Sequence, residues 1–263
     1  MVGRSARLAG AGSTQGDQAG RTGAGDTDRT RTEEAAARAA LIDCALRMNA
    51  LGINQGKSGN VSVRWRGPDG REGMLVTPSG LPYADTEPHH LAWMPLEACD
   101  ERDAVGPLAP SSEWRFHRDI YAHRADAGAI VHTHAPHATA LACLPRVQRD
   151  GIPAFHYMVA MTGGERIGCA RYETFGTQAL SDAVIDSLGA RRACLLANHG
   201  MIALGSTLEA ALALAVEVES LARMYALALS LGEPVVLPAD EMARVLERFR
   251  TYGKQRAGGQ QAL

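Results

Sequence analysis

Three short segments of strand character follow one another early in the chain, and this spacing is the feature that most constrains the fold. Apolar Val61, Val63 and Trp65 alternate with polar residues, as expected for a strand with one buried face. Residues 74–76 form a second such segment, and residues 91–96 form a third. Strands that lie so close in sequence favour a mostly antiparallel sheet over a doubly wound parallel one.

Longer segments with helical periodicity surround these strands and predict helices that cover the sheet. Their expected positions are residues 33–51, a helix of about three turns from residue 113, and residues 178–188, 206–232 and 239–249. Ser206 and Glu209 have capping-box spacing at the start of the fourth helix. Further apolar strands are expected at residues 129–131 and 194–197. The sequence therefore predicts an α/β fold with a central, mostly antiparallel sheet covered by helices.

The first 32 residues differ in composition from the rest of the chain. They are rich in Gly, Ala, Ser, Thr, Arg and Asp and contain almost no large apolar residue. Such a segment buries too little apolar surface to offset the conformational entropy that is lost on ordering. We therefore expect residues 1–32 to be a disordered extension and residues 33–263 to form a single folded domain.

Composition argues against several classes of partner. The formal net charge is −2 and no dense basic patch occurs, which argues against nucleic acid. No apolar run is long enough to span a membrane, and the N-terminal segment contains no apolar signal core. The five cysteines have no CxxC spacing, which is typical of reduced thiols. We expect a cytoplasmic protein without a nucleic-acid or membrane partner.

Histidines follow two of the predicted apolar strands. His132 and His134 come directly after residues 129–131, and residues i and i+2 of a strand point to the same side of the sheet. His199 follows the other strand and precedes Gly200, whose missing side chain permits close approach of the backbone. An isolated His-x-His pair is equally consistent with a polar loop. Three histidines together fit a zinc ion that keeps one position open for substrate.

Three polar segments have the character of an anion site. Ser111 and Ser112 precede Glu113 at a predicted helix N-terminus, where free N–H groups and the helix dipole favour negative charge. The glycine loop at 56–60 and the turn at 77–80 offer further backbone donors. Each feature alone is also consistent with an ordinary helix cap or turn. Together they predict a site for one phosphate group.

Two further features bear on the chemistry. His117 lies one helical turn beyond Glu113 on the same face, and metal sites usually have such orienting partners. Lysine occurs only at Lys57, in the glycine loop, and at Lys254, near the C-terminus. Both are poor positions for the desolvated amine that a Schiff-base enzyme needs.

Several short motifs occur between about Leu41 and Tyr252. They are NQG at 54–56 with GNVSV at 59–63, TPSG at 77–80, SSEWRFH at 111–117, HTH at 132–134, IPAFHYM at 152–158, TFGT at 174–177, HG at 199–200 and FRTYG at 249–253. In this order and over this length they resemble the class II aldolase/adducin family, and most closely its L-fuculose-1-phosphate aldolases. The resemblance covers most of the chain outside the N-terminal extension.

This resemblance implies a three-layer catalytic domain and a homotetramer with active sites at subunit interfaces. One Zn²⁺ per subunit would be held by His132, His134, His199 and Glu113, and Glu113 would also act as acid and base. Tyr157 of a neighbouring subunit would be the second catalytic residue. The residues implied for phosphate and substrate binding are Gly59, Asn60, Ser79, Gly80, Ser111, Ser112, Phe175 and Tyr252.

The implied reaction is the reversible cleavage of a ketose 1-phosphate to dihydroxyacetone phosphate and an aldehyde. Zinc would stabilise the negative charge, Glu113 would move the proton at C3, and Tyr157 would move the proton on the C4 oxygen. Lys57 and Asn198 depart from the fuculose-phosphate aldolase pattern. The sugar therefore stays open between L-fuculose 1-phosphate and related deoxy- or methylthio-pentulose 1-phosphates.

Other functions within the same family stay open. Pentulose-phosphate 4-epimerases share the motifs but release no dihydroxyacetone phosphate, and a sugar-phosphate dehydratase is a less favoured enzyme. Adducin-like members are binding modules without a working metal site. The three histidines and Glu113 argue against this last function.

Overall fold

The computed structural model of the chain describes residues 22–67 and 69–251. The helices and strands are α1 Thr22–Ala50, β1 Asn60–Arg66, β2 Glu72–Val76, β3 Ala92–Pro95, α2 Trp114–His123, β4 Ala129–Thr133, α3 Pro136–Ala142, α4 Pro145–Asp150, β5 Ile152–Pro153, the 3₁₀ helix η4 Tyr157–Thr162, β6 Arg166–Ala170, α5 Gln178–Leu188, β7 Ala193–Leu196, β8 Gly200–Gly205, α6 Leu208–Leu231 and α7 Ala239–Thr251. Among the described residues, no helix has both the length and the apolar character needed to cross a bilayer.

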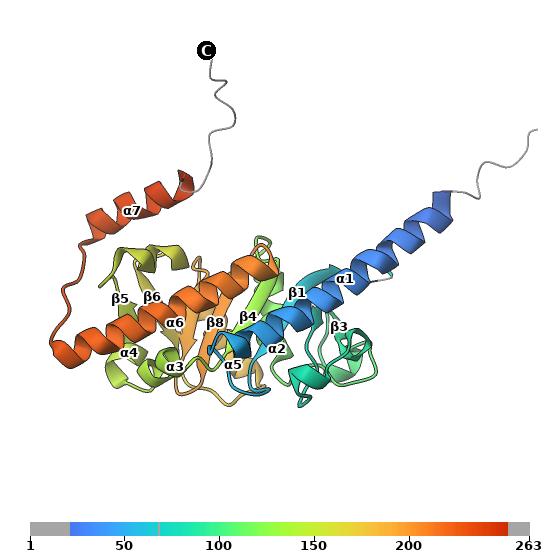
Figure 1. The fold of residues 1–263 in the computed structure, drawn as a ribbon, viewed down its shortest axis with the longest axis horizontal. Helices are drawn as coiled ribbons and strands as arrows, with labels where there is room; N and C mark the ends of the chain where they lie inside the picture. Colours follow the sequence, from blue (N-terminus) through green and yellow to red (C-terminus); the bar gives the residue numbers. More distant parts are fainter. Residues whose placement is uncertain (1–21, 68, 252–263) are drawn as a thin grey trace, which may run out of the picture. The chain divides into compact units, whose positions relative to one another are not determined.

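The strands form one sheet in the order β3-β2-β1-β4-β8-β7-β6-β5 (Figure 1). All neighbouring strands are antiparallel except β6 and β7, which run parallel. This arrangement confirms the predicted mostly antiparallel sheet. At its centre β4 pairs with β1 on one side and with β8 on the other, so that His132 lies opposite both Asn60 and Ile202. The sheet thereby brings Asn60, from the first strand, beside the histidines at the end of β4.

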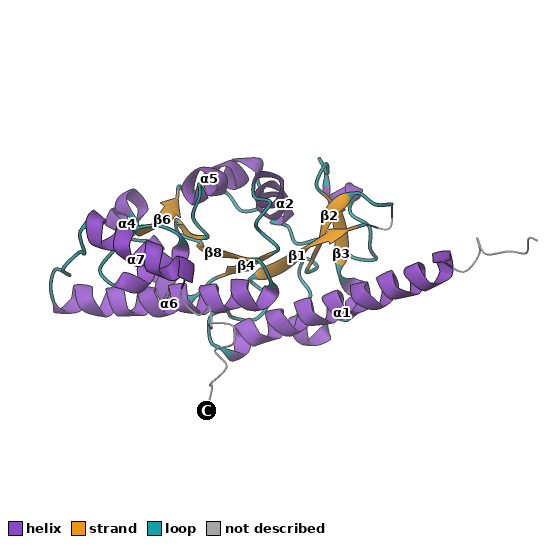
Figure 2. Cartoon of the chain, turned by 90° about the horizontal axis from the view of Figure 1, so that it is seen from above, coloured by secondary structure: helices purple, strands orange, loops and turns teal. Residues whose placement is uncertain are grey.

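Helices cover both faces of the sheet, which gives three layers (Figure 2). Alternate residues of β4 point to opposite faces, so Val131 belongs to one core and Ile130 to the other. The first core lies against α3, α6 and residues 37–50 of α1, and the second lies against α2 and α5. His132 has the same parity as Ile130, and its ring lies edge-on to Phe116 of α2, with ring centroids 5.4 Å apart.

Most of the predicted elements are confirmed. The three early strands are β1, β2 and β3, and the two strands that lead into histidines are β4 and β7. The predicted helices at 178–188 and 239–249 are α5 and α7. The capping-box prediction is wrong by one residue: α6 is capped by Thr207, whose hydroxyl accepts the backbone N–H of Ala210 at 3.2 Å. Strands β5, β6 and β8 were not predicted, since β5 has only two residues, β6 shows no alternation, and the apolar run of β8 follows β7 across a very short turn.

The N-terminal helix differs from expectation. α1 begins at Thr22, so residues 22–32 are helical where we expected disorder, while residues 1–21 lie outside the described residues. Arg29 donates to Glu33 at 2.8 Å, an i,i+4 ion pair of the kind that supports an exposed helix. By their contacts, residues up to Ala36 form one compact unit and residues from Ala37 onward form another. All side chains of the candidate site belong to the second unit.

Candidate active site

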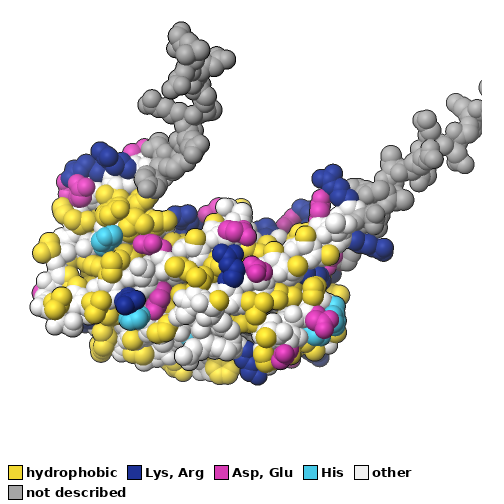
Figure 3. Space-filling view, in the orientation of Figure 1, with side chains coloured by type: hydrophobic (Ala, Val, Ile, Leu, Met, Phe, Trp, Pro, Cys, Tyr) yellow, Lys and Arg dark blue, Asp and Glu magenta, His cyan; other side chains and the backbone are white. Residues whose placement is uncertain are grey.

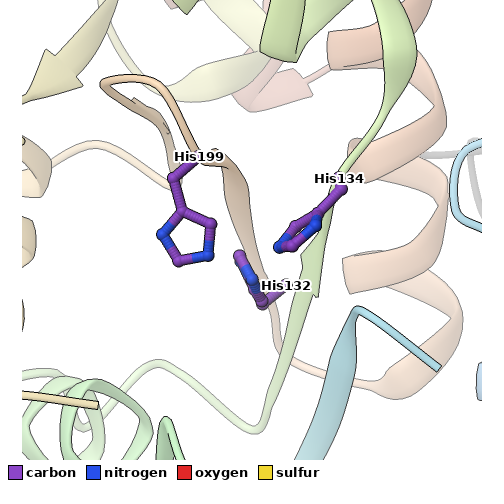
Figure 4. Close-up of side chains that lie close together, drawn as sticks. All are labelled: His132, His134 and His199. Atoms are coloured by element: carbon purple, nitrogen blue, oxygen red, sulfur yellow. The ribbon is translucent and has the colours of Figure 1, made fainter. Parts of the chain in front are cut away.

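Three histidines meet at the end of β4 and at the turn between β7 and β8. Because β4 pairs with β8, the end of one strand lies beside the start of the other. The rings of His132, His134 and His199 point toward one another, with centroids 4.9 to 5.1 Å apart (Figure 4). One nitrogen of each ring lies within 4.8 Å of a nitrogen of the others. The structure therefore brings together the three histidines that the sequence singled out as metal ligands.

The β7–β8 turn explains two residues next to His199. Asn198 has a φ of 54°, in the left-handed region that asparagine tolerates better than most residues. Its side-chain oxygen accepts a hydrogen bond from Gln148 at 2.8 Å. A Cβ on Gly200 would lie 2.6 Å from the carbonyl oxygen of Thr133, so only glycine permits β8 to approach β4 here. Asn198 is thus compatible with the conformation that presents His199.

Hydrogen bonding and burial leave these rings in the form that binds a metal. Nδ1 of His132 donates to the carbonyl oxygen of Met201 at 3.0 Å, which directs Nε2 toward Glu113. Nε2 of both His132 and His134 is buried without a hydrogen-bond partner. Burial and the neighbouring His132 lower the pKa of His134 and of His199 to about 4, so both rings are neutral near neutral pH. Orphaned buried nitrogens of neutral imidazoles fit a bound cation.

Glu113 joins this cluster from the start of α2. It is the N-cap residue, but its side chain does not cap its own helix. Its two carboxylate oxygens lie 3.1 Å from Nε2 of His132 and 3.2 Å from Nε2 of His199. Burial opposes ionisation, but the neighbouring His132 and His199 and the hydrogen bond from Asn60 outweigh it and lower the pKa of Glu113 to about 2. The carboxylate therefore joins the three imidazoles in one donor set, and such a set suits a metal ion.

A cavity of about 340 Å³ opens directly onto these groups. Its lining residues are Ser58, Ser112, Glu113, His134, Tyr172, Glu173, Phe175, Asn198 and His199. Phe175, predicted to surround the substrate, lines this cavity. Sequence reasoning missed Tyr172 and Glu173, although both lie close to Phe175 in the loop after β6. The rings of Tyr172 and Phe175 are 60% and 65% exposed, so this wall of the cavity presents aromatic surface.

The three predicted phosphate segments lie beside one another. Pro78 and Pro110 form an isolated antiparallel bridge, and Nζ of Lys57 lies 2.5 Å from the carbonyl oxygen of Gly80. The backbone N–H groups of Ser79 and Ser111 are already donated to Ala109 and Thr77, at 3.0 and 2.9 Å. Any anion contact from these two serines must therefore come from their hydroxyl groups.

The remaining predicted phosphate ligands differ in exposure. Ser79, Gly80 and Ser112 are exposed, and Ser112 reaches the cavity. Gly59 and Asn60 are buried. A Cβ on Gly59 would lie 2.6 Å from the carbonyl oxygen of His132, so a side chain here would clash with β4. Glycine at this position thus allows the loop at 56–60 to pack against the metal-binding strand.

Tyr157, the predicted second catalytic residue, is not part of this cluster. Tyr157 lies at the start of η4, is 51% exposed and stacks on Phe249 of α7 with ring centroids 6.4 Å apart. It lines a different cavity, of about 490 Å³, together with Met158, Met161 and residues of α7. Tyr252 lies outside the described residues. Within one chain, the structure therefore does not bring Tyr157 to the histidines.

Comparison with known proteins agrees with this geometry. The family described as class II aldolase and adducin N-terminal domain matches residues 39–226. The chain is 54% identical over 218 residues to the 5-methylthioribulose-1-phosphate/5-deoxyribulose-1-phosphate aldolase of Rhodospirillum rubrum, a match that covers 83% of this chain and 93% of the relative. It is 48% identical over 214 residues to the L-fuculose phosphate aldolase of Escherichia coli, covering 81% and 94%. A solved L-fuculose 1-phosphate aldolase is similar with a TM-score of 0.74 and 37% identity, covering 81% of this chain and 96% of that one. The chain belongs to the class II aldolase and adducin family.

Proposed function

We propose that this protein is a zinc-dependent aldolase that reversibly cleaves a ketose 1-phosphate between C3 and C4, giving dihydroxyacetone phosphate and an aldehyde. The observation that carries the proposal is the Glu113 carboxylate, held 3.1 and 3.2 Å from His132 and His199 at the base of an open cavity. Relatives that are 54% and 48% identical are named aldolases of such sugar phosphates.

His132, His134, His199 and Glu113 are the residues that would hold the metal. Neutral imidazoles with a carboxylate are a donor set that suits zinc among the divalent ions. A zinc ion bound there supplies Lewis-acid stabilisation of the negative charge that develops when the C3–C4 bond breaks. The donor set is the support for zinc in this proposal.

Glu113 is proposed as the group that moves the proton at C3. Its lowered pKa, about 2, keeps it ionised, so in the condensation direction it can accept the C3 proton of dihydroxyacetone phosphate. In the cleavage direction the carboxylate would first take up a proton from solvent and then deliver it to C3 as the enediolate is protonated. A lysine-based mechanism is not supported, because Lys57 is exposed and its amine contacts the carbonyl oxygen of Gly80.

Tyr157 is proposed as the proton carrier for the C4 oxygen, acting in the site of a neighbouring copy of the chain. Its exposure, 51%, leaves the hydroxyl available to a second subunit. Exposed hydrophobic side chains occur in and after the C-terminal half of α6, at Leu227, Leu231 and Val235, and hydrophobic atoms lie along α6 in Figure 3. Such surface favours association, and we propose a homotetramer in the cytoplasm with active sites between subunits.

The phosphate of the substrate is proposed to bind the three adjoining segments beside the cavity. The donors would be Asn60, the hydroxyls of Ser79, Ser111 and Ser112, and the backbone near Gly59 and Gly80. Tyr252 and Phe175 would surround the rest of the substrate. The aromatic wall of Tyr172 and Phe175 favours an apolar end on the aldehyde half, as in 5-deoxy- or 5-methylthio-pentulose 1-phosphates.

A panel of ketose 1-phosphates tests the proposal. The protein is incubated with 5-methylthioribulose 1-phosphate, 5-deoxyribulose 1-phosphate and L-fuculose 1-phosphate, and released dihydroxyacetone phosphate is measured. We expect release from at least one, with the highest kcat/KM for a pentulose with an apolar end. A 4-epimerase would convert pentulose phosphates without releasing dihydroxyacetone phosphate, and a binding module would do neither. Either result contradicts the proposed reaction.

A further inference from the structure

A chain of buried polar side chains runs from Glu113 into the layer between the sheet and α2. Nδ2 of Asn60 lies 2.9 Å from Oε2 of Glu113, and Oδ1 of Asn60 lies 2.5 Å from Nε2 of His117. Nδ1 of His117 lies 2.7 Å from the hydroxyl of Ser62, which lies 2.9 Å from the hydroxyl of Tyr121. Apart from Glu113, these residues are at most 4% exposed and line no part of the active-site cavity.

The chemistry of each atom fixes the direction of every hydrogen bond between Glu113 and Tyr121. Ionised Glu113 only accepts, so Asn60 must turn its NH₂ group toward the carboxylate and its oxygen toward His117. An amide oxygen has no hydrogen, so Nε2 of His117 must donate to it. Burial lowers the pKa of His117 to about 3, so the ring is neutral and Nδ1 accepts the hydroxyl proton of Ser62. Tyr121 then donates to the oxygen of Ser62.

The opposite arrangement is excluded by the same chemistry. If the Asn60 amide were turned over, its oxygen would face the Glu113 carboxylate at 2.9 Å, and two acceptors would repel. Its NH₂ group would then require Nε2 of His117 to accept, which would force Nδ1 to donate to Ser62. Only the arrangement with Nε2 protonated satisfies all of these buried atoms together.

We infer that His117 is a positioning residue, which holds the Asn60 amide in the one orientation that presents an N–H group to Glu113. The inference rests on the proposed role of Glu113. The donor from Asn60 anchors Oε2 of the carboxylate, while Oε1 has no hydrogen-bond partner. Oε1 is therefore the oxygen available for proton transfer at C3, and His117 sets this difference without touching substrate or metal.

Kinetics of two His117 variants test this role. His117→Phe keeps the size of the ring but removes the donor to Asn60, and His117→Gln supplies an amide N–H near the position of Nε2. For His117→Phe we expect unchanged zinc content and KM and a fall in kcat of roughly 10- to 100-fold, the usual range for losing a hydrogen bond in a charged network. His117→Gln should recover most of the kcat. His123→Phe, at an exposed position of the same helix, is the matched control and should behave as the wild type.

The inference is overturned if folded, zinc-loaded His117→Phe has the kcat of the wild type. It is also overturned if His117→Gln is folded and zinc-loaded but no more active than the phenylalanine variant. A third measurement needs neither activity nor a stable phenylalanine variant. In zinc-loaded wild-type protein labelled with ¹⁵N-histidine, the signals that disappear in His117→Gln should report a neutral ring with Nε2 protonated. A ring protonated at Nδ1 contradicts the inference whether or not the protein is an aldolase.

Discussion

The two regions with proposed catalytic roles differ in how completely one chain builds them. At the end of β4, Glu113 is 5% exposed and contacts His132, His199 and Asn60 at hydrogen-bonding distances. At η4, Tyr157 is 51% exposed and lines a different cavity, against α7. The first region is fixed by strand pairing and burial. The second has a reactive group but no reaction partner among the described residues of the same chain.

The two regions would therefore serve different steps of the proposed reaction. In the proposed mechanism, metal binding and proton transfer at C3 would depend on groups that one chain positions by itself. Proton transfer at the C4 oxygen would depend on Tyr157, which only subunit association could bring to the site. A variant of Glu113 or of one of the three histidines should therefore inactivate the site of the subunit that carries it. A variant of Tyr157 should inactivate the site of the neighbouring subunit.

The largest effect is expected on removing a metal ligand. His132→Ala, His134→Ala or His199→Ala takes away one of three imidazoles and should lower both zinc content and activity. Loss of several kcal/mol of charge stabilisation corresponds to roughly a thousandfold or more in kcat. Elemental analysis after mild chelation, paired with turnover, measures this. Near-stoichiometric zinc in all three variants would show that the ligand assignment is wrong.

The next effect should separate chemistry from metal binding. Glu113→Gln keeps the size of the side chain but removes its capacity to carry the C3 proton at neutral pH. Exchange of the C3 proton of dihydroxyacetone phosphate should fall by about 10²- to 10⁴-fold, while most of the zinc stays bound. The exchange is followed by NMR in deuterated water. A wild-type rate of exchange in this variant is incompatible with the proposed role of Glu113.

Tyr157→Phe should affect the other half of the reaction. Removal of only the hydroxyl should preserve zinc, subunit association and C3 proton exchange, and should lower net cleavage by roughly 10²-fold or more. Mixing Tyr157→Phe with Glu113→Gln subunits then tests the boundary between subunits. Mixed oligomers should regain activity, because some sites receive both intact residues. If verified subunit exchange restores nothing, the two residues act within one subunit and the contrast between the regions disappears.

Acid should destabilise the metal-free protein through the buried histidines around Glu113. The folded-state pKa values of His134 and His199, about 4, and of His117, about 3, lie below the ordinary value of 6.5. Between these values the unfolded chain binds protons that the folded chain excludes, so the free energy of unfolding should fall as pH drops from 6.5 toward 3. Urea unfolding of chelated protein at several pH values measures the slope. His117→Phe should have a shallower slope than His123→Phe.

The smallest effect is expected at the N-terminus. Deletion of residues 1–32 removes the first turns of α1, and the ion pair between Arg29 and Glu33 is exposed. Such pairs contribute at most about 1 kcal/mol. Zinc content, oligomeric state and turnover should therefore equal those of the full chain. A truncated protein that loses its subunit association would assign this segment to the interface.

The sequence by itself determined much of the fold and singled out the three histidines that the structure brings together. Period-two alternation located β1, and apolar runs located β2, β4 and β7, because buried strands need these patterns wherever they lie. The i, i+2 spacing of His132 and His134 is enough to place both on one side of a strand. Strands β5, β6 and β8 were missed: β5 has only two residues, β6 contains a glycine and a cysteine among its apolar residues, and β8, although an apolar run, follows β7 after three residues.

Only the tertiary structure decided how the chosen residues work together. Glu113 has the sequence context of a helix cap, yet its carboxylate turns toward His132 and His199, because β4 and the turn before β8 approach α2 there. Asn60 and His117 are 57 positions apart in the chain and meet only because β1 pairs with β4 beneath α2. The local sequence shows which types of side chain are present near the site. Their protonation and the direction of their hydrogen bonds depend on burial and on partners from distant segments.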